Sequence, residues 1–232
     1  MKSLGHKGVL KMNNDRKFFI QQQKIRLVFV ELITSIKKET YLIYGVFFTI
    51  SLLLISVFNK FYLHTSVNQF HTSFLDVFFK YVTHLGDGAM FGVLVLLFLF
   101  IKRKMALVFI VGGVLTLLVT HLFKKVLFKG IPRPVGALGE EALHLVDGVK
   151  MALWNSFPSG HTTTAFAIFT ILCLYFSKCK SQYLWMSLAI IASFSRVYLS
   201  QHFLIDIFVG SFLGIAIGFV SMAFFCKPKR VH

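Results

Sequence analysis

Six apolar, nearly uncharged stretches constrain this chain more than any other feature of its sequence. They cover residues 41–58, 86–101, 105–123, 159–177, 183–200 and 202–225. A helix needs about 20 mostly apolar residues to cross the hydrocarbon core of a bilayer. In the second stretch, Gly86, Asp87 and Gly88 are expected to break or kink the helix. The sequence therefore predicts an all-α, polytopic membrane protein with six transmembrane helices.

The composition excludes an ordinary water-soluble domain. Hydrophobic residues make up 56% of the chain and charged residues 15%, whereas soluble domains carry about 25% charged residues. The formal net charge of +16 could suggest nucleic acid, but binding of that kind needs a soluble basic face with readout elements. We find no such face, so no nucleic-acid partner is expected.

Basic residues gather in four regions that connect or flank the apolar stretches. Residues 1–40 contain nine Lys and Arg, residues 102–104 three, residues 177–182 two and residues 227–230 three. With six spans, all four regions fall on one side of the membrane. Lys and Arg near span ends mark the cytoplasmic side, so both termini are expected in the cytoplasm and the protein in the cell (inner) membrane.

The segment before the first span has the pattern of an interfacial helix. Ile25, Phe29, Leu32 and Ile36 recur at helical spacing opposite polar and basic residues, which predicts an amphipathic helix lying on the membrane. A plain anchoring role is favoured over a regulatory one. The predicted organisation is a cytoplasmic basic segment with this helix, one membrane domain and a cytoplasmic basic tail, over residues 1–40, 41–226 and 227–232.

The polar residues inside or beside the spans gather at the outer surface in this topology. There the third span ends, the fourth begins, the fifth ends and the sixth begins, and residues 128–157 form a loop rich in Gly and Pro. Charged groups at such positions are costly unless they face a polar cavity or each other. The residues concerned are Lys124, Lys125, Arg133, Ser159, Gly160, His161, Arg196, His202 and Asp206.

His202 and Asp206 are four residues apart, which places both side chains on one face of a helix. The carboxylate would then accept a hydrogen bond from one imidazole nitrogen, fix the tautomer and leave the other nitrogen as a nucleophile. A purely structural His–Asp pair is the alternative.

Pro158, Ser159, Gly160 and His161 open the fourth span, and backbone N–H groups at a helix start bind anions. His161 is suited to donate a proton to a leaving oxygen. The alternative is a capping Ser followed by an interfacial His. Arg133, Arg196 and a Lys at the end of the third span match phosphate oxygens, although such side chains also reach toward lipid headgroups.

Together these residues make the chain resemble the type 2 phosphatidic acid phosphatase superfamily, in its bacterial membrane branch. That branch includes lipid A, phosphatidylglycerol phosphate and undecaprenyl pyrophosphate phosphatases. The second motif of the superfamily is intact as Pro158, Ser159, Gly160 and His161. The third is intact as Ser195 and Arg196, five residues, His202, three residues and Asp206.

The first motif departs from the pattern of a Lys, six residues and then Arg-Pro, because Val126 stands seven positions before Arg133. One or two extra residues are expected in the turn before Arg133. The phosphate-binding Lys is then Lys124 or Lys125, and Lys124 is favoured because it directly follows the apolar helix.

The resemblance implies a metal-independent lipid phosphatase with its active site facing the periplasm or exterior. His202 would attack phosphorus, Asp206 would orient it and His161 would protonate the departing oxygen. Lys124, Arg133, Ser159, Gly160 and Arg196 would hold the phosphate. Candidate substrates are phosphatidate, phosphatidylglycerol phosphate, undecaprenyl pyrophosphate and the phosphates of lipid A. No metal or cofactor is expected.

Two other functions remain open from the sequence. A phosphotransferase would pass the phosphate to another lipid instead of water. A transporter or lipid-handling protein would only bind phosphate, but the inverted repeats common in transporters are absent from this sequence.

Overall fold

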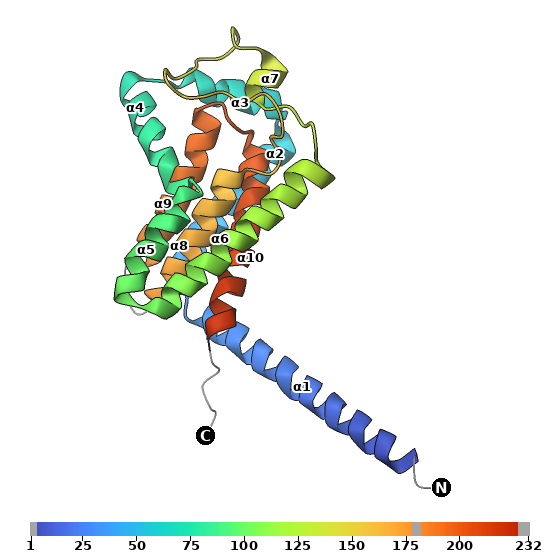
Figure 1. The fold of residues 1–232 in the computed structure, drawn as a ribbon. Helices are drawn as coiled ribbons and strands as arrows, with labels where there is room; N and C mark the ends of the chain where they lie inside the picture. The colour runs from blue at the N-terminus through green and yellow to red at the C-terminus, as the bar shows by residue number, and fades with distance from the viewer. Residues whose placement is uncertain (1–3, 178–181, 227–232) are drawn as a thin grey trace.

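The computed structural model describes residues 4–177 and 182–226, with side chains from residue 18 onward. All of the regular elements in these residues are helices, which confirms the predicted all-α class. Figure 1 shows their arrangement. The elements are α1 (Leu4–Thr34), α2 (Lys38–Val57), α3 (Lys60–Gln69), α4 (Ser73–Val82), η1 (Thr83–Gly86), α5 (Ala89–Ile101), α6 (Arg103–His121), η2 (Leu122–Leu127), α7 (Pro134–Leu138), α8 (Gly160–Tyr175), α9 (Gln182–Tyr198) and α10 (Leu204–Phe225).

Each of the six apolar stretches contains one helix, namely α2, α5, α6, α8, α9 or α10. By length and hydropathy, three helical segments of the described chain could cross a bilayer: α2, α10 and the continuous segment of α6 with η2. The pair formed by α4 with η1 and α5 makes a fourth if it is one span, and α8 is apolar but has only 16 residues. The count of six spans therefore stays a prediction.

The predicted break at Gly86, Asp87 and Gly88 is present. The helices on its two sides meet at 61°. A Cβ atom on Gly86 would lie 2.7 Å from the backbone oxygen of His161, closer than real side chains approach. Gly86 therefore lets this bend lie directly against the first turn of α8.

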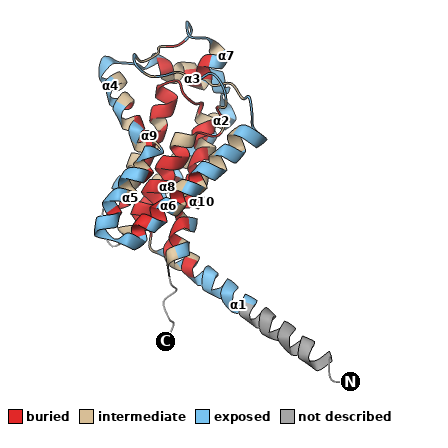
Figure 2. Cartoon of the chain, viewed as in Figure 1, coloured by how far each residue is buried: buried red, intermediate tan, exposed pale blue. Residues whose placement is uncertain are grey.

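Helix α8 forms the centre of the bundle. Its residues from Thr162 to Leu174 are all buried, and Figure 2 shows this helix inside a shell of more exposed ones. It packs against α10, α9 and α6. The approach to α10 is close, because a Cβ atom on Gly214 would lie 2.5 Å from the backbone oxygen of Thr163. This agrees with the close helix packing that small residues permit in membranes.

The outer surface of the bundle is apolar. Large side chains that point outward include Leu53, Leu96, Phe100, Leu117 and Phe224. Exposed apolar surface on this scale would be costly in water. A lipid environment removes that cost, so the surface is consistent with a membrane-embedded protein.

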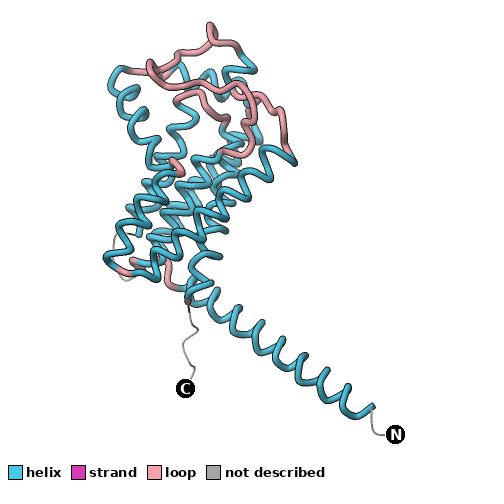
Figure 3. The backbone as a smooth tube through the Cα atoms, in the orientation of Figure 1, coloured by secondary structure: helices cyan, strands magenta, loops and turns pink. Residues whose placement is uncertain are grey.

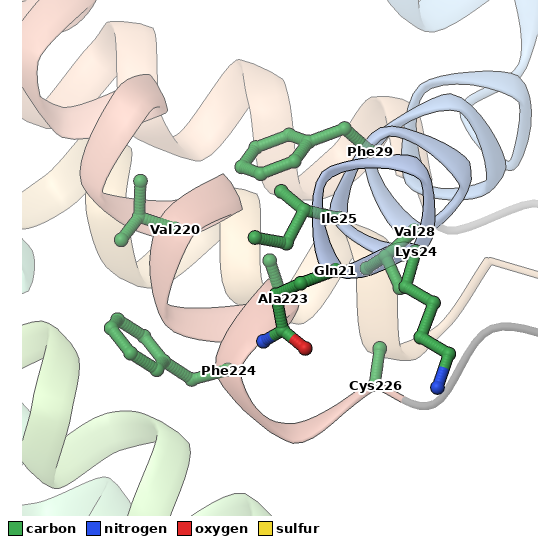
Figure 4. Close-up of a pocket in the computed structure, with 9 residues that line it drawn as sticks. All are labelled: Gln21, Lys24, Ile25, Val28, Phe29, Val220, Ala223, Phe224 and Cys226. Atoms are coloured by element: carbon green, nitrogen blue, oxygen red, sulfur yellow. The ribbon is translucent and has the colours of Figure 1, made fainter. Parts of the chain in front are cut away.

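Helix α1 is longer than the predicted interfacial segment and projects away from the bundle (Figure 1). Its last turns bury Val28 and Leu32 against the core, whereas Ile25 is exposed. A pocket of about 510 Å³ lies between α1 and the end of α10, lined mainly by apolar side chains such as Phe29 and Phe224 (Figure 4). Whether α1 lies on a membrane surface stays a prediction, and the predicted tail 227–232 falls outside the described residues.

The two ends of the bundle differ in character. The α5–α6 turn and the junction of α1 with α2 lie at one end, and Figure 3 shows irregular structure gathered at the other, where residues 128–159 run. The basic residues 102–104 and the long loop therefore lie at opposite ends, as the predicted topology requires.

Candidate active site

The two arms of the long loop pair with each other immediately before α8. The N–H of Arg133 donates to the backbone oxygen of Leu153 at 2.8 Å, and the N–H of Ser156 donates to that of Ile131 at 3.0 Å. This pairing brings the first predicted motif next to the second. It continues into the bundle, because the N–H of Ser159 donates to the backbone oxygen of Asp206 at 3.1 Å.

His202 and Asp206 form a buried pair at the start of α10. Nδ1 of His202 lies 3.2 Å from Oδ2 of Asp206, and the two residues are 1% and 2% exposed. The same Oδ2 also accepts from the N–H of Phe203 at 3.0 Å and from the hydroxyl of Ser156. The carboxylate is thus held by two further donors, and the imidazole presents Nε2 away from the pair.

The start of α8 provides backbone N–H groups next to a lysine. The hydroxyl of Ser159 caps the helix by accepting from the N–H of Thr162 at 3.3 Å. A Cβ atom on Gly160 would lie 3.7 Å from Nζ of Lys124. Lys124 is partly buried and Lys125 is exposed, so Lys124 is the lysine that reaches this helix start.

The two arginines converge on one side chain. Nη1 of Arg133 and Nη2 of Arg196 lie 3.1 Å and 3.4 Å from Oε1 of Gln201. Arg133 also donates through Nε to the backbone oxygen of Trp154 at 3.1 Å. Arg196 donates through Nη1 to the hydroxyl of Thr83 at 2.6 Å, and its buried Nε has no hydrogen-bond partner among the described residues. Such an unpartnered buried donor is expected where an anion binds.

His161 faces the bend between η1 and α5. Its Nε2 lies 4.0 Å from Oδ2 of Asp87, while Oδ1 of Asp87 accepts from the N–H of Ala89 at 2.9 Å. Both side chains remain partly exposed. The imidazole is therefore partly accessible, and the carboxylate of Asp87 lies opposite it.

The site has an excess of positive charge. Within the described chain, no carboxylate lies within 4.0 Å of the charged groups of Lys124, Arg133 or Arg196. His202 is 1% exposed, and its imidazole lies within the electrostatic reach of these three cations. Neutral His202 in a positively charged setting suits nucleophilic attack on an anion.

The structure thus brings together the eight predicted site residues, and it adds others that sequence reasoning missed. Ser156, Gln201 and Thr83 each contact a predicted site residue, but none has a motif spacing or charge that could have revealed it. Asp87 carried a signal, as a carboxylate within an apolar stretch. The described residues contain no group of three or more His, Cys, Asp or Glu side chains arranged to hold a metal ion.

A groove of about 430 Å³ lies between the start of α5, α6 and the start of α8. Apolar residues such as Phe91, Val114 and Leu117 line it, and so do Gly160 and His161 of the candidate site. Its position and lining match the needs of a hydrocarbon chain attached to a phosphate.

Known proteins share both sequence and fold with this chain. It is 29% identical to undecaprenyl-diphosphatase BcrC of Bacillus subtilis (strain 168) over 157 residues, which is 66% of this chain and 77% of the relative. It is 36% identical to bacitracin transport permease protein BcrC of Bacillus licheniformis over 61 residues, which is 26% of this chain and 29% of that protein.

Two solved structures have a similar fold. The crystal structure of Aquifex aeolicus LpxE superposes with a TM-score of 0.59 and 27% identity, covering 69% of this chain and 92% of that one. A PAP2-type phosphatidylglycerolphosphate phosphatase from Bacillus subtilis superposes with a TM-score of 0.56, covering 81% of this chain and 96% of that one. At 19% identity, this similarity concerns the fold alone.

A model of the PAP2 superfamily matches residues 103–230, which include every predicted site residue. This match covers more than half of the chain, and the fold agrees with it. The chain therefore belongs to the PAP2 superfamily and is a membrane lipid phosphatase of that type.

Proposed function

We propose that this enzyme hydrolyses a phosphomonoester or pyrophosphate of a membrane lipid through a phosphohistidine at His202. One observation carries this proposal: a buried imidazole, ordered by Asp206 and Ser156, stands among three cations that have no carboxylate partner in the described part of the chain. That arrangement combines an activated nucleophile with electrostatic stabilisation of phosphate charge.

In the first step the lone pair on Nε2 of His202 attacks phosphorus, and the bond from phosphorus to the leaving oxygen breaks. His161 gives its Nε2 proton to that oxygen. The Nδ1 proton of His202 stays hydrogen-bonded to Asp206, which offsets the positive charge on the phosphorylated ring. Lys124, Arg133 and Arg196, with the N–H of Gly160 and the hydroxyl of Ser159, hold the phosphate oxygens. The backbone N–H of Ser159, which the sequence placed among the phosphate donors, is instead bonded to the backbone oxygen of Asp206.

In the second step water attacks phosphorus and the bond from phosphorus to Nε2 breaks. His161, now neutral, takes a proton from the water. The products are inorganic phosphate and neutral His202, with His161 protonated again. The cycle consumes one water molecule and needs no metal.

The groove between α5 and α6 supports a substrate with a hydrocarbon chain. Its end at His161 would place the leaving oxygen of such a lipid beside the proton donor. Among the four candidate lipids we favour a polyprenyl pyrophosphate, because a relative named for undecaprenyl diphosphate matches over 77% of its length. Phosphatidate, phosphatidylglycerol phosphate and the phosphates of lipid A are the remaining candidates.

We further propose that residues 41–226 form the membrane phosphatase domain, with residues 1–40 and 227–232 in the cytoplasm. The site would then face the periplasm or exterior. The separation of residues 102–104 from the long loop supports this orientation.

The test is phosphate release by the purified, detergent-solubilised enzyme with EDTA present, across the four lipids. His202→Ala should abolish release from the lipid that wild type cleaves, and acid-labile label from a ³²P substrate should be trapped on wild type only. His144→Ala is the matched control. His144 and Asp76 form a second His–Asp pair, with Nε2 of His144 3.0 Å from Oδ2 of Asp76, and this pair lies outside the site.

Release that survives in His202→Ala would refute the phosphohistidine mechanism. Label appearing on an added lipid alcohol, with little free phosphate, would favour the phosphotransferase. Lipid binding without either product would favour a transporter.

A further inference from the structure

Gln201 is the residue on which the two arginines of the site meet. It is 3% exposed. Its Oε1 accepts from Arg133 at 3.1 Å and from Arg196 at 3.4 Å, and its backbone oxygen accepts from Arg133 at 3.2 Å. One amide side chain thus sets the relative position of two guanidinium groups from segments 63 residues apart.

The other end of the same side chain holds the long loop. Nε2 of Gln201 lies 3.3 Å from the backbone oxygen of Lys150 and 2.9 Å from Sδ of Met151. Because these acceptors occupy the Nε2 end, the oxygen must face the arginines. The orientation of the amide is therefore determined by its surroundings on both sides.

The neutrality of this side chain matters as much as its position. Two guanidinium groups close together repel each other, and the usual solution is a carboxylate between them. Gln201 instead offers an uncharged acceptor, so both positive charges stay available to an incoming anion. A glutamate of the same shape would pair with both arginines and compete with that anion.

We propose that Gln201 is a positioning residue that holds Arg133 and Arg196 together without neutralising them, and thereby sets the affinity of the site for phosphate. The inference rests on the proposed function in placing phosphate between these arginines. It goes beyond that function in assigning a role to a residue that acts only through other residues.

The test compares Gln201→Glu with wild type in binding of inorganic phosphate, measured by calorimetry on the detergent-solubilised protein without lipid substrate. We expect the dissociation constant to rise about tenfold or more, the scale of one charged hydrogen bond, while the melting temperature does not fall. In lipid turnover, KM should rise more than kcat falls.

Gln182→Glu is the matched control. Gln182 is also fully buried and bonded at both ends of its amide, with Oε1 2.8 Å from the N–H of Lys37 and Nε2 3.0 Å from the oxygen of Ser35. It lies at the opposite end of α9 from the site. Its substitution should lower the melting temperature and leave phosphate affinity unchanged.

Phosphate binding by Gln201→Glu that equals wild type, or changes no more than in the control, overturns the inference, as does a wild type that binds no phosphate. If Gln201→Glu does not fold, Gln201→Asn applies, since its shorter amide cannot span both arginines and the loop. A third outcome separates the two proposals. If Gln201→Glu loses phosphate binding but wild type cleaves no lipid, this inference is upheld and the proposed function is refuted.

Discussion

At the scale of single residues, the proposed reactivity of His202 would depend on side chains that perform no chemistry themselves. Asp206 bonds to the imidazole, and Ser156 in turn donates to Asp206. A hydrogen bond to a charged group contributes about 1.5–3 kcal/mol. In the proposed mechanism, the carboxylate that orients the nucleophile therefore depends on a serine that carries no charge and belongs to no motif.

Ser156→Ala should reduce kcat about tenfold or more, the rate equivalent of about 1.4 kcal/mol, because Asp206 loses a donor and no longer holds His202 in one orientation. KM should change little, since Ser156 does not contact the arginines. Steady-state phosphate release measures both. Ser193→Ala is the control, because Ser193 is equally buried but donates only to the oxygen of Ala189 within α9. Equal kcat values in the two variants would contradict this role.

His64 should make folding stability sensitive to acid. Burial lowers the pKa of His64 from 6.5 to about 4. Among the described residues, only the hydroxyl of Ser200, at 3.1 Å from Nε2, bonds to its ring. The unfolded chain therefore binds a proton near pH 6.5 that the folded protein takes up only near pH 4. Stability is fully present above pH 6.5 and falls as the pH drops through this window, by about 3 kcal/mol in all.

Thermal unfolding of wild type and His64→Gln in detergent, between pH 7.5 and 4, measures this effect. The melting temperature of the variant should fall less than that of wild type over this range. Parallel curves for the two proteins would show that His64 contributes nothing to the acid sensitivity.

At the scale of elements, a π-helical turn stands at the end of the third predicted span. It covers Leu122–Leu127 and contains both candidate lysines of the first motif. Lys124 is partly buried and its Nζ lies near the start of α8 at Gly160, whereas Lys125 is exposed. The extra one or two residues expected in the turn before Arg133 stay a prediction.

Lys124→Ala should therefore raise KM and lower phosphate release at least tenfold, which corresponds to about 1.4 kcal/mol of lost phosphate interaction. Lys125→Ala should behave like wild type, because the side chain of Lys125 is exposed. The pair is compared by phosphate release over a range of lipid concentrations. A larger loss in Lys125→Ala would identify Lys125 as the phosphate ligand.

Helices and motif residues were predictable from the sequence, but their supporting contacts were not. Hydropathy located helices in all six stretches, and the helix break at Asp87 followed from its two glycines. Motif spacing predicted that His202 and Asp206 share one face of a helix. The two side chains do meet, but His202 lies two residues before α10 begins, so the helical part of that prediction is wrong. Gln201 and Thr83 could not be found, because their contacts arise when segments distant in sequence meet and leave no periodicity or charge to read.

At the scale of the whole molecule, function depends on which end faces which compartment. The candidate site lies at the end that contains the long loop, and α1 leaves from the opposite end. The groove lined by Phe91 of α5, Val114 and Leu117 of α6 and His161 of α8 connects apolar helix surface with the candidate site. Released phosphate would leave on the side of the loop, which makes orientation part of the mechanism.

We predict that the loop of residues 128–157 lies on the outer side of the membrane and that the basic turn of residues 102–104 lies on the cytoplasmic side. In a variant lacking the native Cys173, Cys179 and Cys226, Glu140→Cys should react with a membrane-impermeant maleimide in intact cells. Lys104→Cys should react only after permeabilisation. Glu140 and Lys104 are both exposed, so access from the solvent side decides the labelling. The positive charges of residues 102–104 favour the cytoplasmic side. If Lys104→Cys were labelled in intact cells and Glu140→Cys were protected, the predicted orientation would be wrong. Phosphate would then be released into the cytoplasm.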